Sequence, residues 1–463
     1  METNGRALSS SMLHTLNQNK GMKSLNTIAK RYSLKIVVIA GCFLLWHCQS
    51  DVPSPETPEL KPYEVTLKQA TQVALKYDFV GKDSTDARTR ITGNKTVEKQ
   101  ETVYDSDNKT SLFHIINYKE GGFMLVSADL RAMPVLAYGD KSNFDTKEIS
   151  SVNGLSWWLT NTKTQLKDIK KDPKPAHDIV IKEWKKYLDG DLNLPKSGSK
   201  TTTNTNCQEW YTIGQYMCQN SIYTRGPLLT LSTELPSGIA WGQSGISNYY
   251  MPSSTWCIGS GCLRDPAGCG PVAMAQILWH LHPDSRFGYS SMPHTSAYSC
   301  TASSAGEQSL AQLMQSCGAV TNSQYHFGNT CNTLTYPWNI PSGLQALGLS
   351  NGGNTSSFNP SLIETEVYQG YPIIFYGYNT ITDWHIWLCD GFKRHDYSQY
   401  DCDTHACSTW SYEYFYMNWG WGLSGAANSG TTYNGWYGSG NFTPNGTSYN
   451  FNSGLTMIKG IRK

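Results

Sequence analysis

The length, charge and composition of the chain exclude several classes of protein. Its 463 residues are too many for one hydrophobic core, so we expect more than one domain. A formal net charge of +1 argues against nucleic acid as a partner. With 16% charged residues, 12% aromatic residues and 41 glycines, the chain is neither disordered nor fibrous, and its composition is that of an exported, folded protein.

The N-terminus has the layout of an export segment. Basic residues precede an apolar run at 36–46, and this run is too short to span a bilayer as a helix. The run ends near Cys48, and a proline-rich stretch follows. We therefore expect a lipoprotein-type export segment at 1–48, a lipid anchor at Cys48 and a tether at 49–62. Cleavage before Cys42, or plain secretion without lipid, is the alternative. In each case the protein is exported, to the outer surface, to a periplasm-facing position or into the medium.

A first folded domain is expected at 63–195. Apolar residues at helical spacing cover 67–77, and a strand is expected at 113–118. The sequence GGFMLVSAD at 121–129 and the apolar stretch at 134–138 predict a strand, a turn and a further strand. These elements indicate a small α+β domain.

The segment 196–225 is expected to be a linker and maturation region. Its first part, KSGSKTTTNTN at 196–206, is poor in apolar residues and rich in Ser, Thr and Gly, a composition typical of flexible linkers that proteases enter easily. A second domain is then expected at 226–463. The bond between Arg225 and Gly226 is the predicted site of cleavage.

A glycine-flanked cysteine, Cys269, opens an apolar helix that is expected at 272–281. Gly268 and Gly270 leave backbone room around the sulfur, and Pro271 suits the first turn of a helix. A cysteine at a helix N-terminus lies at the positive end of the helix dipole, which favours the thiolate that attacks carbonyl groups. A buried structural cysteine on a core helix is the alternative interpretation of this segment alone.

Three further residues supply groups that a thiol nucleophile needs. Upstream, the side-chain amide of Gln243 could donate a hydrogen bond to an oxyanion. Downstream, His385 and Asn418 lie on expected strands that end in glycine. The order Cys, His, Asn is that of papain-like thiol proteases.

Together these elements resemble the streptopain family of secreted bacterial cysteine peptidases. The resemblance is carried by WGQ at 241–243, GC at 268–269, AQI at 275–277, His385 and NWGWG at 418–422. The first domain is similar to the inhibitory propeptide of the family in its GGF and SAD sequences, at 121–123 and 127–129.

The resemblance implies a fold and an activity. The implied fold class is α+β: a papain-like catalytic domain with a helical part around Cys269 and an antiparallel sheet part, preceded by a small α+β prodomain that covers the site. The implied protein is a cysteine-type endopeptidase made as a zymogen. Its substrates are proteins or peptides, and its own prodomain is an intramolecular inhibitor. Neither a cofactor nor a metal ion is expected.

Each candidate residue has an expected role. Cys269 attacks the peptide carbonyl, and His385 takes the thiol proton and later protonates the leaving amine. Gln243 and the backbone N–H of Cys269 donate to the tetrahedral oxyanion, and Asn418 holds the imidazole by its other nitrogen. Gln276 is expected to be a core residue. Three tryptophans are expected to orient the histidine or to line the substrate cleft: Trp384, Trp419 and Trp421.

The cysteines give an independent constraint. Of 13 cysteines, two belong to the export segment, and setting Cys269 aside leaves ten that can pair. Close spacing makes Cys257 with Cys262, and Cys402 with Cys407, candidates for small loops, while the connectivity stays open. Zinc binding is the alternative, although the nearby histidines form no recognisable ligand pattern.

One segment departs from the pattern of the family. Residues 393–412 resemble an insertion between the His385 strand and the Asn418 strand.

Two other functions are alternatives to a peptidase. A cysteine amidase acting on cell-wall peptides would use the same Cys and His. A non-catalytic surface protein could bind glycans or proteins through the aromatic C-terminal half, but it would not need Gln243 and Cys269 as well.

Overall fold

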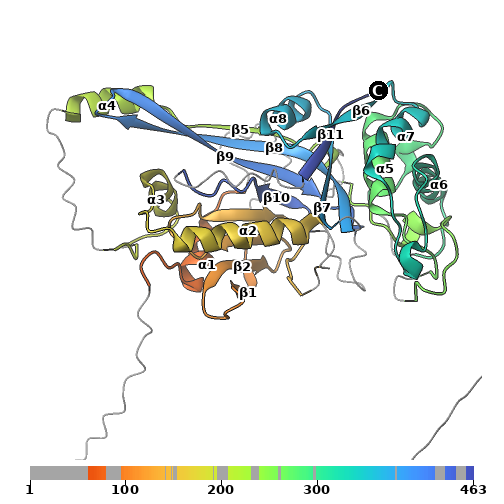
Figure 1. Cartoon of the computed structure of the whole chain (residues 1–463), viewed down its shortest axis with the longest axis horizontal. Coiled ribbons are helices and arrows are strands. Elements are labelled where there is room, and N and C mark those ends of the chain that lie inside the picture. Colours follow the sequence, from red (N-terminus) through yellow and green to blue (C-terminus); the bar gives the residue numbers. More distant parts are fainter. Residues whose placement is uncertain are drawn as a thin grey trace, which may run out of the picture. The chain divides into compact units, whose positions relative to one another are not determined.

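A computed structural model gives the fold of the chain from residue 61 onward (Figure 1). The residues that it describes are 61–79, 95–140, 142–147, 149, 154–190, 192–195, 207–230, 239–258, 262–295, 299–380, 383–422, 433–444 and 455–463. The export segment with Cys48, and the expected linker at 196–206, lie outside them. No helix within these ranges is long and apolar enough to cross a membrane.

The first domain is an antiparallel sheet with three helices. Its strands pair in chain order: β1 (Val97–Tyr104), β2 (Ser111–Tyr118), β3 (Phe123–Ser127) and β4 (Val135–Gly139). Its helices are α1 (Leu67–Lys76), α2 (Gly154–Lys171) and α3 (Asp178–Lys185). A capping box in which Thr66 and Gln69 bond reciprocally starts α1. The small α+β domain predicted from the sequence is confirmed.

The second domain has a helical part and a sheet part, as Figure 1 shows. The helices are α5 (Cys269–Leu281), α6 (Ala305–Val320), α7 (Ile340–Ala346) and α8 (Pro360–Tyr368). The strands are β6 (Asn351–Ser357), β7 (Ile373–Thr380), β8 (Asp383–Asp401), β9 (Ala406–Asn418), β10 (Gly435–Gly438) and β11 (Leu455–Arg462). The predicted α+β class is therefore confirmed.

One antiparallel sheet runs through both domains. In the described part of the chain its strand order is β1-β2-β3-β4-β10-β9-β8-β7-β11-β6, and β5 (Ser221–Arg225) pairs with β8. The junction is the pairing of β4 with β10, where Tyr138 lies opposite Trp436 and Ala137 opposite Tyr437. The backbone of the second domain thus continues the sheet of the first.

The strand β8 lies between two hydrophobic cores. Because side chains alternate along a strand, Ile386 and Leu388 pack into the core of the helices α5 to α7, whereas Trp387 and Cys389 pack into a core shared with the first domain. All four side chains are buried, which explains why this segment is apolar at consecutive positions.

The segment 207–225 differs from its prediction as part of a linker. It forms the helix α4 (Cys207–Met217) and the strand β5, which pairs with β8 from Ser221 opposite Asp396 to Arg225 opposite Phe392. The pairing partner is the expected insertion at 393–412, which extends β8 and β9 into a long hairpin. A disulfide between Cys218 and Cys407 ties the two together.

The cysteine pairing also differs from the expected small loops. The described disulfides are Cys218–Cys407, Cys257–Cys331 and Cys262–Cys300, and Cys402 is disulfide-bonded as well. Three described cysteines are free thiols: Cys269, Cys317 and Cys389. Of the ten cysteines that could pair, Cys317 and Cys389 do not, because they serve as fully buried apolar side chains. In the described ranges, His, Cys, Asp and Glu form no group of three or more that could hold a metal ion.

Candidate active site

The candidate nucleophile, Cys269, is the first residue of α5 and is half-buried. The glycines on either side of it are required by close contacts. A Cβ on Gly268, which has a φ of +97°, would lie 2.9 Å from Cγ2 of Thr333, and one on Gly270 would lie 2.5 Å from Cγ2 of Thr335. The chain at 333–335 thus presses against the loop that presents the sulfur.

The sulfur of Cys269 lies against the strand that carries the candidate histidine. Burial raises the pKa of the Cys269 thiol, and the main-chain N–H of Ile386 acts in the opposite direction. Because Ile386 follows His385 directly in β8, this contact places the N-terminus of α5 beside the strand that carries His385.

The imidazole of His385 is buried and held by main chain and aromatic rings. Its Nε2 lies 3.0 Å from the carbonyl oxygen of Trp419, and its ring stacks on Trp387 with centroids 5.9 Å apart. A carbonyl oxygen only accepts, so Nε2 carries the hydrogen and Nδ1 is the basic nitrogen. Burial lowers the pKa of His385 to about 4, and the Trp419 carbonyl acts in the opposite direction.

The described side chain of Asn418 does not hold the imidazole as expected. The carbonyl of the next residue, Trp419, occupies that place, and the side chain of Asn418 is directed elsewhere. Its Nδ2 donates to the carbonyl of Ile239 at 2.8 Å and to Oε1 of Gln276 at 2.7 Å, and its Oδ1 accepts from the N–H of Gly420 at 3.2 Å. Asn418 is therefore a link between chain segments.

The segment that carries Gln243 is fastened to the nucleophile loop. The main-chain carbonyl of Gln243 accepts from the N–H of Ala267 at 2.8 Å, two residues before Cys269. Upstream, Ile239 receives the hydrogen bond from Asn418. Gln243 is half-buried.

The three expected tryptophans have different places. Trp419 is fully buried, with its Nε1 donating to the carbonyl of Tyr433 at 3.1 Å, so its ring does not line an open cleft here. Trp421 is half-buried, and its ring centroid lies 6.0 Å from that of His385. The side chain of Trp384 lies outside the described part of the structure.

The first domain reaches the aromatic rings behind the histidine. The helix α2 begins at Gly154, where a Cβ would lie 2.7 Å from Cε3 of Trp387 and 2.9 Å from Cζ3 of Trp419. Farther along α2, Nε1 of Trp158 donates to the carbonyl of Gly438 at 3.1 Å. Trp387, which stacks on His385, and Trp419, whose carbonyl accepts its hydrogen bond, are thus both in contact with the first domain.

Sequence reasoning missed Trp387 and Gln276 as parts of the site. Trp387 had a signal, because it lies two residues after His385 on a strand and therefore on the same face. Gln276 had one as well, because it is the amide in an otherwise apolar helical stretch and shares a helix face with Cys269.

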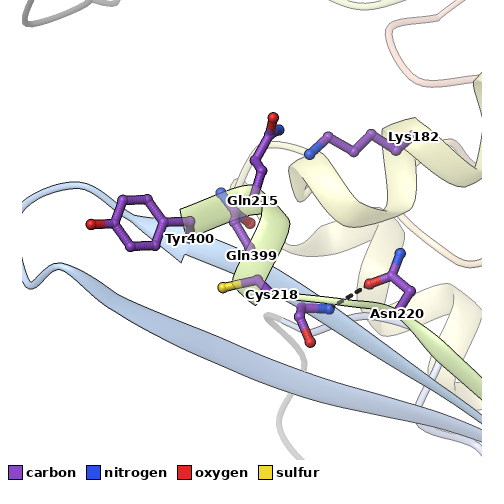
Figure 2. Close-up of a pocket in the computed structure, with 7 residues that line it drawn as sticks. Lys182, Gln215, Cys218, Asn220, Gln399 and Tyr400 are labelled. Atoms are coloured by element: carbon purple, nitrogen blue, oxygen red, sulfur yellow. Dashed lines mark hydrogen bonds between the residues drawn. The ribbon is translucent and has the colours of Figure 1, made fainter. Parts of the chain in front are cut away.

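A cavity of about 330 Å³ lies away from these residues (Figure 2). It is lined by residues of α3, α4 and β8, including Lys182, Gln215 and Gln399. The main-chain N–H of Ser398 donates to Oδ1 of Asn220 beside it at 2.7 Å. None of the candidate catalytic residues lines this cavity, so it does not mark the active site.

Comparison with protein-family models accounts for both domains. Residues 62–166 match the Spi protease inhibitor model, and residues 241–437 match the peptidase C10 family model. The two ranges together cover about two thirds of the chain and contain all the candidate catalytic residues. The second domain is a peptidase C10 domain, and the first is a Spi-type inhibitor domain. The protein is a cysteine-type endopeptidase preceded by an inhibitory propeptide domain, as the resemblance to streptopain implied. The family match favours a peptidase over an amidase or a non-catalytic binding protein.

Solved structures of related proteins were also found. A fragment of prointerpain A from Prevotella intermedia, with a cysteine-to-alanine substitution, is 17% identical, covers 80% of this chain and 99% of its own, and has a TM-score of 0.46. Active wild-type interpain A from the same organism is 18% identical, covers 52% of this chain and 96% of its own, and has a TM-score of 0.34. No match was found among curated proteins.

Proposed function

We propose that this C10 peptidase cleaves peptide bonds with the thiolate of Cys269 and the imidazole of His385, and that it is made as a latent zymogen. The observation that carries this proposal is that Cys269 packs against the same hydrophobic core as Ile386, the residue next to His385, which brings the N-terminus of α5 beside the strand that carries the histidine.

The reaction divides between the two groups. Nδ1 of His385 takes the thiol proton while Nε2–H stays bonded to the Trp419 carbonyl, and Sγ of Cys269 forms a bond to the peptide carbonyl carbon. The carbonyl oxygen becomes an oxyanion, to which Gln243 and the N–H of Cys269 donate. The imidazolium then protonates the leaving amine as the C–N bond breaks. Water, deprotonated by His385, hydrolyses the acyl-enzyme and restores the thiol.

The environment of the pair supports latency. The described hydrogen bond of His385 runs to the main chain at Trp419 rather than to Cys269. Burial raises the pKa of Cys269 and lowers that of His385, so both shifts favour the neutral thiol and the neutral imidazole. His385 also shares a strand face with Trp387, which the first domain covers through Gly154. We infer that the first domain keeps the pair neutral and apart until it is removed.

Trp421 and Trp384 are our candidates for lining the cleft that binds protein or peptide substrates.

The export segment at 1–48 supports action outside the cytoplasm, with a lipid anchor at Cys48. Substitution Cys48→Ala, with radiolabelled palmitate in the host, tests the anchor: we expect label on the unsubstituted chain and none on the variant, and an unlabelled parent chain would leave plain secretion.

The catalytic assignment is tested by comparing free thiols. Cys269→Ala should abolish hydrolysis of casein and labelling by an epoxide thiol inhibitor, because it removes the nucleophile. Cys317→Ala is a matched control, since Cys317 is a free thiol buried on α6. This control should be labelled and active like the parent. Casein hydrolysis by the matured Cys269→Ala chain at the parent rate would contradict the proposal.

A further inference from the structure

The side chain of Gln276 is fully buried on α5 and makes a one-sided set of contacts. Its Oε1 accepts from Nδ2 of Asn418 at 2.7 Å, whereas its Nε2 is buried and meets no acceptor in the described part of the chain. An apolar residue would avoid the cost of burying that unsatisfied amide. The oxygen is therefore the functional end of this side chain.

Gln276 shares one face of α5 with the candidate nucleophile. Cys269, Val272 and Gln276 follow the spacing i, i+3, i+7, which places them along one stripe of a helix. The turn that follows β9 lies directly on this stripe. Gly420 has a φ of +69°, and a Cβ on it would lie 3.1 Å from Cγ1 of Val272.

That turn holds the histidine. The carbonyl of Trp419 lies 3.0 Å from Nε2 of His385, and Oδ1 of Asn418 accepts from the N–H of Gly420 at 3.2 Å, which bridges the Trp419 peptide. Both hydrogens on Nδ2 of Asn418 are used, one by Gln276 and one by Ile239 on the Gln243 segment. Asn418 therefore joins the nucleophile helix, the histidine-holding turn and the oxyanion segment.

We propose that Gln276 is a positioning residue for the peptidase reaction. It holds the amide of Asn418 against α5, and through Asn418 it sets the place of the Trp419 carbonyl and thus of the His385 imidazole relative to the Cys269 thiol. The inference rests on the proposed Cys269 and His385 pair.

The acceptor is removed by Gln276→Met, which keeps the length of the side chain. In the matured enzyme we expect kcat to fall about 10- to 100-fold with KM within about twofold, because a displaced imidazole affects the reacting geometry and not substrate binding. The acidic limb of the pH profile of kcat/KM should move, since it reports the protonation of the pair. Gln276→Glu retains an acceptor oxygen and should keep most of kcat below the pKa of its carboxyl.

Two controls separate positioning from packing. Ile277→Val changes a buried neighbour on α5 and should leave kcat and the pH profile unchanged. In an Asn418→Ala background, Gln276→Met should lower kcat less than about threefold, because the two residues act through one hydrogen bond. A full additional loss in that background would overturn the proposal, as would a parent-like kcat in Gln276→Met.

The outcomes remain decisive if one variant does not fold. Where Gln276→Met fails to mature, even with wild-type enzyme added in trans, Gln276→Glu supplies the readout. Its carboxyl should add an ionisation to the pH profile of kcat if position 276 is coupled to the imidazole, and an unchanged profile overturns the coupling. Activity in matured Cys269→Ala would instead refute the nucleophile and leave the Gln276 result to be judged separately.

Discussion

Nε2 of His385 donates a hydrogen bond to the main-chain carbonyl of Trp419 at a distance of 3.0 Å. From the order Cys, His, Asn in the sequence, the side chain of Asn418 is expected to hold the imidazole instead. The Trp419 peptide is fixed on both sides, since its N–H donates to Oδ1 of Asn434 at 3.0 Å and the next N–H donates to Asn418. The orientation of the imidazole therefore depends on the backbone of the turn at 418–420.

Gly420→Ala should impair catalysis through this backbone. Its φ of +69° is unfavourable for alanine, and the added Cβ would lie 3.1 Å from Val272, so the turn must shift and move the Trp419 carbonyl. We expect a loss of about 1–2 kcal/mol in unfolding free energy and a fall in kcat of at least about tenfold. Denaturant unfolding and steady-state kinetics of the matured enzyme measure the two effects.

Gly328→Ala is the matched control for this prediction. Gly328 has a φ of +66°, but a Cβ on it would meet no atom of the described residues within 4 Å, so alanine there has the same backbone strain away from the site. This variant should lose similar stability and retain kcat. Equal kcat values in the two variants would show that the turn does not govern the imidazole.

The local elements of the site were predictable because each leaves a pattern in a short stretch. The glycines around Cys269, the apolar helix after it and the strand that carries His385 are dictated by close approach and periodicity. The role of the Trp419 carbonyl was not predictable, since every residue has such an acceptor and the sequence does not reveal which one faces the ring. For the same reason the side chain of Asn418 was assigned the wrong partner.

The parts of the fold that failed prediction depend on contacts distant in sequence. The disulfides join residues 189, 74 and 38 positions apart, whereas the expected loops paired near neighbours. The segment 207–225 was interpreted as part of a linker, since the strand with which it pairs, at 392–396, follows much later in the chain. Neither the disulfide of Cys218 nor this strand pairing leaves a pattern in the neighbouring sequence.

Thiol reactivity should change with maturation in a direction set by the two pKa shifts. In the precursor the pKa of Cys269 is raised and that of His385 is lowered to about 4, both by burial. The thiolate should therefore form only at alkaline pH. Once the first domain is removed, hydration should relax both shifts and the ion pair should extend reactivity to acidic pH. Alkylation of Cys269 by iodoacetamide, followed by mass spectrometry across pH, tests this, and identical profiles before and after maturation would contradict it.

The mature N-terminus should lie at or before Cys207 rather than at Gly226. Arg225 is paired with Phe392, and a Cβ on Gly226 would lie 2.4 Å from the carbonyl oxygen of Asp390, so the Arg225–Gly226 bond is packed against β8. Cleavage in the Ser- and Thr-rich stretch at 196–206 would leave α4 and β5 on the enzyme. Intact mass of the matured protein decides between these positions.

The disulfide between Cys218 and Cys407 allows cleavage at the Arg225–Gly226 bond to be recognised. If cleavage occurred at Arg225, the fragment ending there would stay attached through Cys407 and appear only after reduction. A mature enzyme that starts at Gly226 and carries no attached fragment before reduction would contradict retention of α4 and β5.

Weakening the contact between the domains should relieve latency before any cleavage. The domains share one hydrophobic core and a continuous sheet, so we expect the first domain to stay bound after a cut in the linker, rather than to dissociate on simple dilution. Trp158 is central to this contact, since its ring is fully buried, packs on Tyr437 with centroids 4.9 Å apart and donates a hydrogen bond to the carbonyl of Gly438.

Trp158→Ala should cost about 3–5 kcal/mol at this contact. In the uncut precursor it should therefore raise epoxide labelling of Cys269 and shorten the lag before casein hydrolysis. Tyr104→Ala is the control, because Tyr104 is 48% exposed on the same domain, and it should leave the lag unchanged. A Trp158→Ala precursor that folds and stays as latent as the parent would show that latency does not depend on the shared core.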